Sequence, residues 1–338
     1  MNIRRLLLVL ATIIAAVVLL VLLVHLSGLR ADQFWRAVSA LGPYEMAGCL
    51  IGFALPVLIA SIKWRSVVSR ALRAPSILPN FLFFFHFSAL SGVMGQVITP
   101  YAAGPIVRGL ATKRGGHGGF ALGASTSVLE QFFDAWASLI FAGMGILLFL
   151  IGVPEQIALM GYILAAIIGA VGVQVILVLP SSTRVLGWVG NILPGQRERL
   201  KNLENLKTQT DLINTRFVSR LYWLSVLRFW VLGVAVIAVA STFGEDWSVL
   251  GLLHVYATVQ ITRFAVFTPG NLGLAEWGWT TVLTLYGWDF ATAALFSLTF
   301  RAVGLVFTCM IYVFAALCYL VPNWRTGGAP DAKNEDSR

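Results

Sequence analysis

Charged residues are scarce in this chain of 338 residues. Asp, Glu, Lys and Arg together make up 12% of it, whereas apolar residues make up 58% and the mean hydropathy is +0.82. A soluble domain needs a charged and polar surface, so this composition excludes a soluble globular fold. The chain is predicted to be an all-α, polytopic transmembrane protein.

Several motifs are also missing. The chain has only three cysteines, all inside apolar runs and without the spacing of a zinc site or a disulfide framework. No Walker motif, zincin helix, nucleophile elbow or Rossmann glycine pattern is present. We therefore expect no cofactor, no metal site and no catalytic residue. Any transport would draw energy from a gradient, a membrane potential or a partner, or would only equilibrate two leaflets.

Long apolar runs are what the chain does contain. A helix of about 20 apolar residues crosses a bilayer, and runs of about that length or more occur at residues 6–26, 44–62, 119–151, 158–179, 221–242 and 290–321. The first run exceeds the apolar region of a signal peptide, about 7–15 residues, so we expect a retained helix. The run 119–151 is too long for one perpendicular helix, so we expect its first part to be interfacial or strongly tilted.

The basic residues indicate how these helices cross the membrane. Lys and Arg number 24 against 15 Asp and Glu, and because they lie in loops we assign them to membrane topology and not to nucleic-acid binding. Basic clusters begin at Lys63 and Arg108 and continue in the loop 180–220, whereas only Arg30 and Arg36 fall in loops expected on the outer side. We therefore expect a multi-pass inner-membrane protein with both termini in the cytoplasm.

The predicted organisation is one transmembrane domain, residues 1–322, with repeats at about 40–180 and 218–322. In the loop 180–220, apolar residues recur at near-helical spacing among charges, which is typical of an amphipathic helix on the inner leaflet. The polar tail, residues 323–338, is expected to be disordered.

Two short segments interrupt the apolar pattern at corresponding positions of the two halves. Residues 97–104 and 266–273 share the frame V-x-T-P-x-x-x-G. Loop charges place the first segment in a stretch that enters from inside and the second in a stretch that enters from outside. Paired segments interrupted by Gly and Pro are typical of the midplane site of an inverted-repeat transporter. We therefore expect two inverted repeats, each with a re-entrant or broken helical hairpin, the first with its tip near Ser91–Gly92 or Gly95.

At these residues the sequence resembles the flippase-like family named after the transmembrane region of lysylphosphatidylglycerol synthase. The resemblance covers about residues 42–321. The family motif P-G-x-x-G-x-x-E is complete in Pro269, Gly270, Gly273 and Glu276. The motif S-V-x-x-E-R-x-x-D is present at residues 127–134 with Gln131 in place of Arg, and P-x-x-x-G-E-x-x-R at residues 100–108 with Pro105 in place of Glu.

The resemblance implies a membrane domain that moves a phospholipid or lipid-linked intermediate between leaflets. In the synthases a soluble aminoacyl-transfer domain follows this membrane domain. We expect no such domain after residue 321, and hence a transporter and not an enzyme. The expected partner is a membrane lipid with an anionic headgroup.

Charges within apolar sequence are the candidates for a translocation path. An ionisable group at the bilayer centre costs at least about 2.5–3.5 kcal/mol, so it is a functional candidate by default. Arg263 and Arg301 could contact a headgroup phosphate, or they could form structural ion pairs with one of three carboxylates, Glu130, Asp134 or Glu276. Glu130 and Asp134 share one helix face, because they are four residues apart, and could couple protons or neutralise Arg301. Glu276 could equally cap the helix that follows it.

Arg108 and Arg228 are expected nearer an interface, where snorkelling competes with substrate binding. Gly and Pro shape the two breaks, and N–H groups exposed there could bind phosphate. The candidate translocation residues are Thr99, Pro100, Gly104, Arg108, Glu130, Asp134, Arg263, Thr268, Pro269, Gly270, Asn271, Gly273, Glu276 and Arg301.

Two other function classes remain open. One is a membrane-embedded transferase acting on a polyprenyl or hopanoid-type lipid, with Glu130 or Asp134 as base or metal ligand, although the paired aspartate-rich motif for a prenyl diphosphate is missing. The other is a non-catalytic subunit that holds a soluble synthase or glycosyltransferase through the loop 180–220. A homo-oligomer is compatible with either class.

Overall fold

The structure is a computed structural model that describes residues 3–72, 78–152, 155–178, 214–244, 249–260, 262 and 268–325. These residues form helices and connecting turns, and no strand occurs among them. The helices are α1 (Ile3–Ser27), α2 (Ala31–Ser39), α3 (Pro43–Ala71), α4 (Phe81–Val97), α5 (Pro100–Arg114), α6 (Gly119–Ile151), α7 (Glu155–Val178), α10 (Thr215–Ala240), η3 (Ser241–Phe243), α11 (Val249–Val259), η5 (Pro269–Asn271), α12 (Leu274–Leu285) and α13 (Phe290–Arg325). The prediction of an all-α, polytopic membrane protein is confirmed.

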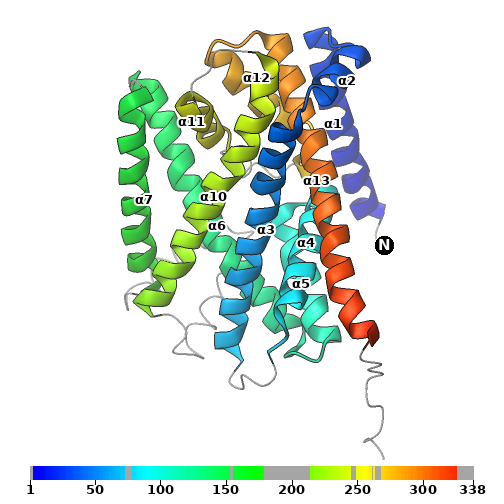
Figure 1. Ribbon diagram of the computed structural model, residues 1–338, viewed down its shortest axis with the longest axis vertical. Coiled ribbons are helices and arrows are strands. Elements are labelled where there is room, and N and C mark those ends of the chain that lie inside the picture. The colour runs from blue at the N-terminus through cyan, green and yellow to red at the C-terminus, as the bar shows by residue number, and fades with distance from the viewer. Residues whose placement is uncertain are drawn as a thin grey trace, which may run out of the picture.

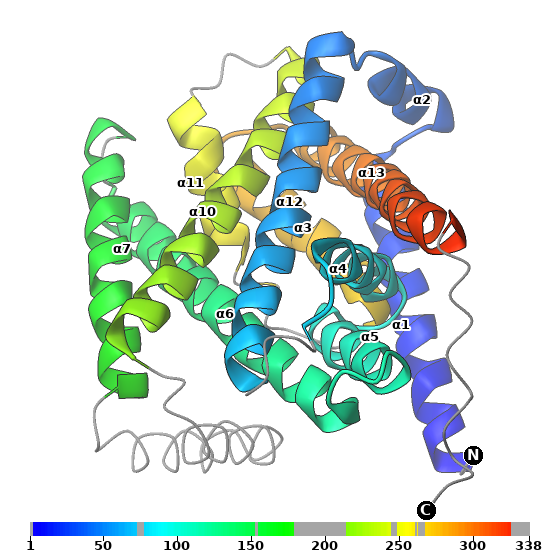
Figure 2. The ribbon, with the colours of Figure 1, turned by 60° about the horizontal axis from the view of Figure 1, so that its bottom comes forward.

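Within the described residues, five helices are long and apolar enough to cross a membrane, namely α3, α6, α7, α10 and α13. The pair α1 and α2 would make a sixth span and is bent by 91°, so that α2 lies across the upper end of the molecule (Figure 1). The helix α6 has 33 residues and runs obliquely from α7 to α5, as Figure 2 shows. A tilt lets so long a helix remain within an apolar layer about 30 Å thick.

The two ends of the bundle differ in charge. The lower end in Figure 1, where α3 and α5 end and α10 begins, carries Arg65, Arg70, Lys113, Arg114, Arg216 and Arg220. The upper end carries a mixture of signs, with Asp32 of α2 bonded to Arg30 and Arg36. This asymmetry is compatible with the predicted sidedness. Most of the basic loop, residues 179–213, and the tail from residue 326 lie outside the described residues, while α13 continues to Arg325, past the predicted start of the tail.

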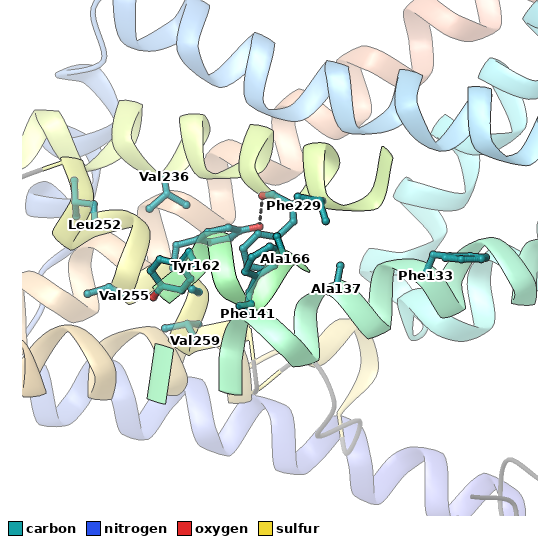
Figure 3. Packing of buried hydrophobic residues seen from close by; sticks show 14 of the residues in the cluster. Phe133, Ala137, Phe141, Tyr162, Ala166, Phe229, Val236, Leu252, Val255 and Val259 are labelled. Atoms are coloured by element: carbon teal, nitrogen blue, oxygen red, sulfur yellow. Dashed lines mark hydrogen bonds between the residues drawn. The ribbon is translucent and has the colours of Figure 1, made fainter. Parts of the chain in front are cut away.

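The largest apolar core lies where α6, α7, α10 and α11 meet. Rings of Phe141, Phe229, Trp230 and Tyr162 pack with centroids 4.8–6.2 Å apart, mostly edge to face, and Figure 3 shows Phe141 and Phe229 between the helices that carry them. Aromatic pairs of this kind add about 0.5–1.5 kcal/mol each beyond their burial. The core therefore packs these four helices together, and it extends to residues of α3, α12 and α13.

The helices α3 and α10 approach unusually closely. A Cβ added at Gly52 would lie 2.5 Å from the backbone nitrogen of Ala235, so only glycine fits there. Small residues allow this backbone contact, as is common between helices in membranes. The contact matters for the site, because α3 and α10 both contribute charged side chains to it.

Each half contains a pair of short helices connected by a break. The first pair, α4 and α5, lies in the lower half of the molecule and the second, α11 and α12, in the upper half (Figure 1), as an inverted arrangement requires. The predicted tip near Ser91–Gly92 or Gly95 is wrong, because α4 continues to Val97. The chain turns at Ile98 and Thr99, where Pro100 starts α5 and the Thr99 hydroxyl accepts a hydrogen bond from the backbone N–H of Ala102. Proline at the first position and a threonine cap both favour a new helix at this point.

The second break is less regular than the first, and it touches the first. Gly270 (φ 57°), Asn271 (φ 60°) and Gly273 (φ 82°) have left-handed or related backbone conformations. The Gly270 N–H donates to the carbonyl of Ile98 at 2.7 Å. The two V-x-T-P-x-x-x-G frames, far apart in sequence, therefore meet in the interior of the bundle.

Candidate functional site: a charged cavity between the two breaks

The first group of charges surrounds Glu130 and Asp134, which lie one turn apart on α6. Lys63 Nζ lies 2.5 Å from Asp134 Oδ1 and 3.3 Å from Glu130 Oε1. Arg108 Nη1 lies 2.5 Å from Glu130 Oε2. Arg228 donates to Asp134 Oδ2 and lies 3.8 Å from Glu130 Oε1. Four helices, α3, α5, α6 and α10, thus bring three cations to two carboxylates.

Neutral groups complete this network. The Lys63 ammonium also donates to the hydroxyl of Ser225 at 2.6 Å and to the carbonyl of Glu130 at 3.3 Å. The Arg108 guanidinium donates to Ser88 at 3.3 Å and lies 4.8 Å from the ring centroid of Trp64. Buried charges are tolerated when paired and hydrogen-bonded, whereas removal of one partner leaves an uncompensated charge.

The second group of charges lies at the break of the second hairpin. The Gly273 N–H donates to Glu276 Oε2 at 2.7 Å, so Glu276 caps α12 from its first turn. Its other oxygen lies 3.6 Å from Arg301 Nε, and Arg301 Nη2 donates to the carbonyl of Gly270 at 2.8 Å. Glu276 is therefore both the cap and the ion-pair partner that the sequence left as alternatives. Asn271 secures the turn by donating to the carbonyl of Thr262 at 3.1 Å.

Both groups line one cavity of about 370 Å³ between the breaks. They differ in how far they reach into it. Lys63 is not one of the described lining residues and its side chain is 0% exposed, and Glu130 lines the cavity with a side chain that is only 1% exposed. Those of Arg228 and Arg301 are 34% and 26% exposed, and both residues line the cavity. These two guanidiniums are thus the cations that a ligand in the cavity could touch.

The rest of the cavity wall is partly apolar. Backbone of both breaks faces the cavity, at Thr99 and Gly270. The cavity therefore offers cations on one part of its surface and hydrocarbon on another. The apolar side chains that line it include those of Phe53, Val57, Trp279, Phe300 and Leu305.

The charges do not balance among the described residues around this cavity. Lys63, Arg108, Arg228 and Arg301 oppose Glu130, Asp134 and Glu276, which leaves one positive charge in excess if all are ionised. A low-dielectric site with an excess cation favours an anion. A lipid phosphodiester carries one negative charge and would match it.

The structure brings most of the predicted residues together. Lining the cavity are Thr99, Gly104, Arg108, Glu130, Asp134, Gly270, Asn271, Glu276 and Arg301. Thr268, Pro269 and Gly273 are not among the described lining residues and form the second break beside the cavity, and Pro100 starts α5 at the first break. Gly104 allows α5 to pack on α6, because a Cβ there would overlap the Gln131 side chain. Arg263 lies outside the described residues.

The expected locations of three basic residues are wrong. The sequence places Lys63 in a basic cluster at the membrane surface, but α3 continues to Ala71 and buries it completely. Arg108 is 4% exposed and paired with Glu130, and Arg228 is paired with Asp134, so neither snorkels to an interface. Of the three carboxylates that the sequence left open as ion-pair partners of Arg301, the structure pairs it with Glu276.

Sequence reasoning missed Lys63 and underestimated Arg228. A signal for Lys63 exists in the apolar residues Val67 and Val68 that follow it, because they extend the apolar face of the helix beyond the first basic residue. Ser225 could not have been singled out, since an isolated serine in an apolar run has many ordinary roles.

Among the described residues, no group of three His, Cys, Asp or Glu side chains could hold a metal ion. A family model described as the lysylphosphatidylglycerol synthase TM region matches residues 8–311. No curated protein and no solved structure matches the chain.

Proposed function

Because the chain belongs to the family of the lysylphosphatidylglycerol synthase TM region, we propose that it moves an anionic phospholipid or lipid-linked intermediate between leaflets through the charged cavity. The observation that carries this proposal is the pair of reachable cations, Arg228 and Arg301, in one cavity with an apolar wall. A lipid needs both kinds of surface, cations for its phosphate and hydrocarbon for its chains.

Arg228 and Arg301 are held by different ion-pair partners in different parts of the molecule, and this arrangement suggests a route for the headgroup. Arg228 is held by Asp134 of α6 and lies next to the aromatic core. Arg301 is held by Glu276 and by the Gly270 carbonyl at the irregular break. A phosphate could bind one guanidinium and then the other without losing a cation partner in hydrocarbon. A Coulombic contact of this kind is strong because water is largely excluded.

We further propose that this movement involves no chemical change in the lipid and takes place in the inner membrane, with both termini in the cytoplasm. The distribution of described charges between the two ends supports this orientation, since basic side chains collect on the cytoplasmic side of membrane proteins. The break between α4 and α5 would then be reached from the cytoplasmic leaflet and the second break from the opposite one.

The test is lipid exchange in proteoliposomes. Purified protein is reconstituted with a fluorescent phosphatidylglycerol, and a membrane-impermeant quencher measures how much label reaches the outer leaflet over time. We expect the wild type to accelerate exchange. Arg301→Gln should slow it by at least about tenfold, since one charge-assisted hydrogen bond contributes about 1.5–3 kcal/mol and 1.4 kcal/mol is tenfold. Arg301→Lys, which keeps the charge, should slow it less.

The matched control is Arg114→Gln, which removes an exposed arginine at the end of α5, away from the cavity. It should exchange lipid like the wild type. Equal exchange in Arg301→Gln and wild type, with both variants folded by size-exclusion chromatography, would rule out this path for the headgroup.

A further inference from the structure

A second, smaller pocket lies at the basic end of the bundle, between the end of α3 and the start of α10. It encloses about 260 Å³ and is lined by Ser66, Ser69, Arg70, Arg216, Phe217 and Arg220. None of these described residues lines the charged cavity. The pocket is therefore a site separate from the charged cavity.

The side chains of this basic pocket are arranged around one space. Arg216 and Arg220 are four residues apart and share one face of α10. Arg70 comes from α3, and its guanidinium lies 4.2 Å from the centroid of the buried Phe217 ring. The stacking orients that guanidinium across the gap between the two helices.

The chemistry of the lining favours phosphate. Three guanidiniums supply hydrogen-bond donors, whereas the Ser66 and Ser69 hydroxyls donate to backbone carbonyls of α3, and none of the described lining residues is acidic. Guanidinium groups bind phosphate oxygens through paired, charge-assisted hydrogen bonds. Basic pockets between transmembrane helices on the cytoplasmic side are suited to anionic lipid headgroups. We propose that this basic pocket binds a phosphate group, carried by an anionic lipid headgroup or by a soluble phosphate.

Occupation of the pocket would affect the pairing of α3 with α10. The same two helices carry Lys63 and Arg228, which lie seven residues from Arg70 and eight from Arg220. At 1.5 Å per residue these separations are about 10–12 Å along the helices. A bound phosphate would neutralise the arginines that face each other across the helix pair, and so stabilise the contact at Gly52 and Ala235 on which the charged cavity also depends.

The test uses the full chain in detergent micelles and three probes, namely phosphatidylglycerol, phosphatidylcholine and inorganic phosphate. The thermal unfolding midpoint is followed as each probe is titrated, and native mass spectrometry counts lipid that stays bound. The pocket variant is the double change Arg216→Gln with Arg220→Gln. The control variant is Arg65→Gln with Arg114→Gln, which removes two exposed arginines at the same end but outside the pocket.

We expect phosphatidylglycerol, but not phosphatidylcholine, to raise the midpoint of the wild type and of the control variant. In the pocket variant the concentration needed for half of that rise should increase by at least about tenfold, because each Lys or Arg near an anionic headgroup contributes about 1 kcal/mol. Arg70→Lys, which keeps the charge and loses the stacked plane, should give an intermediate increase.

Inorganic phosphate distinguishes the two sources of the ligand. A rise of the midpoint at millimolar phosphate that is lost in the pocket variant assigns the site to a soluble phosphate, and a response to phosphatidylglycerol alone assigns it to a lipid. Equal responses of the pocket and control variants to every probe would overturn the proposal, because the basic end would then act only through its net charge.

Discussion

The two hairpins carry opposite charges. In the first half, the hairpin helix α5 carries the cation, Arg108, and the helix that follows, α6, carries its carboxylate, Glu130. In the second half, the hairpin helix α12 carries the carboxylate, Glu276, and the helix that follows, α13, carries the cation, Arg301. Each hairpin is thus neutralised by its own following helix, and the excess positive charge comes from Lys63 and Arg228 against Asp134.

The hairpins also differ in rigidity and exposure. The ion pair of the first hairpin, Arg108 with Glu130, is buried, since both side chains are at most 5% exposed. The break of this hairpin is a simple capped turn. The second pair is reached from the cavity, and its break contains three residues with positive φ. We infer that the first hairpin keeps a fixed position, whereas the second holds Arg301 of α13, to which we assign headgroup binding, at the cavity. Substitutions that affect one hairpin and spare the other test this difference.

The largest effect is expected for Glu130→Gln. Loss of this carboxylate leaves Lys63 and Arg108 buried with less compensation, so the free energy of unfolding should fall by about 3–5 kcal/mol. Unfolding by SDS titration in mixed micelles measures it. The control is Asp32→Asn, whose partners Arg30 and Arg36 are exposed, and which should cost less than about 1 kcal/mol. Equal losses of unfolding free energy in the two variants would show that the Arg108–Glu130 pair is not excluded from solvent.

Gly270→Ala should have the second largest effect and lower the free energy of unfolding by about 2–4 kcal/mol. A Cβ there would overlap the backbone oxygen of Gln96, which cannot move like a side chain, and φ is 57°. Gly104→Ala in the first hairpin meets only the side chains of Gln131 and Ser127 and should cost less. Gly116→Ala, also at positive φ but with open space, controls for backbone strain alone. A cost for Gly270→Ala no greater than that of Gly116→Ala would contradict the contact between the two breaks.

Glu276→Gln should have a moderate effect, about 1–2 kcal/mol on the same SDS scale. The amide oxygen can still accept from the Gly273 N–H, and Arg301 remains partly exposed to the cavity. Glu276→Ala removes the cap as well and should cost about 1 kcal/mol more. If Glu276→Gln lowered the free energy of unfolding as much as Glu130→Gln does, the two ion pairs would be equally excluded from solvent. The contrast drawn between the hairpins would then be wrong.

The smallest effects concern the two threonines that precede the prolines. Thr99→Val removes a cap of α5 and should cost about 1 kcal/mol. Thr268 is buried, and its hydroxyl has no hydrogen-bond partner among the described residues. Thr268→Val keeps its shape and should be neutral or slightly stabilising. Thermal unfolding in detergent separates the two, and equal losses would show that both threonines act as caps.

Part of this architecture is determined by local sequence. The apolar runs predict the spanning helices, because burying a polar backbone in hydrocarbon requires a helix about 20 residues long. The two Thr-Pro frames predict the breaks, since proline favours the first position of a new helix. The spacing of Glu130 and Asp134 places both on one face of α6, as observed. The prediction of the first tip fails because glycine is a turn signal in sequence, whereas α4 contains Gly92 and Gly95 without a break.

Only the tertiary structure decided which charges meet. Lys63 lies 71 residues from Asp134 and 162 from Ser225 in the chain, and no periodicity connects them. Whether a lysine at the end of an apolar run is exposed depends on how far its helix continues and on what packs beside it, which here is the close contact of α3 with α10. The sequence by itself determined a helical membrane protein with two breaks and buried carboxylates. The packing of four helices decided their partners, because the cost of a buried charge is set by what surrounds it and not by its position along the chain.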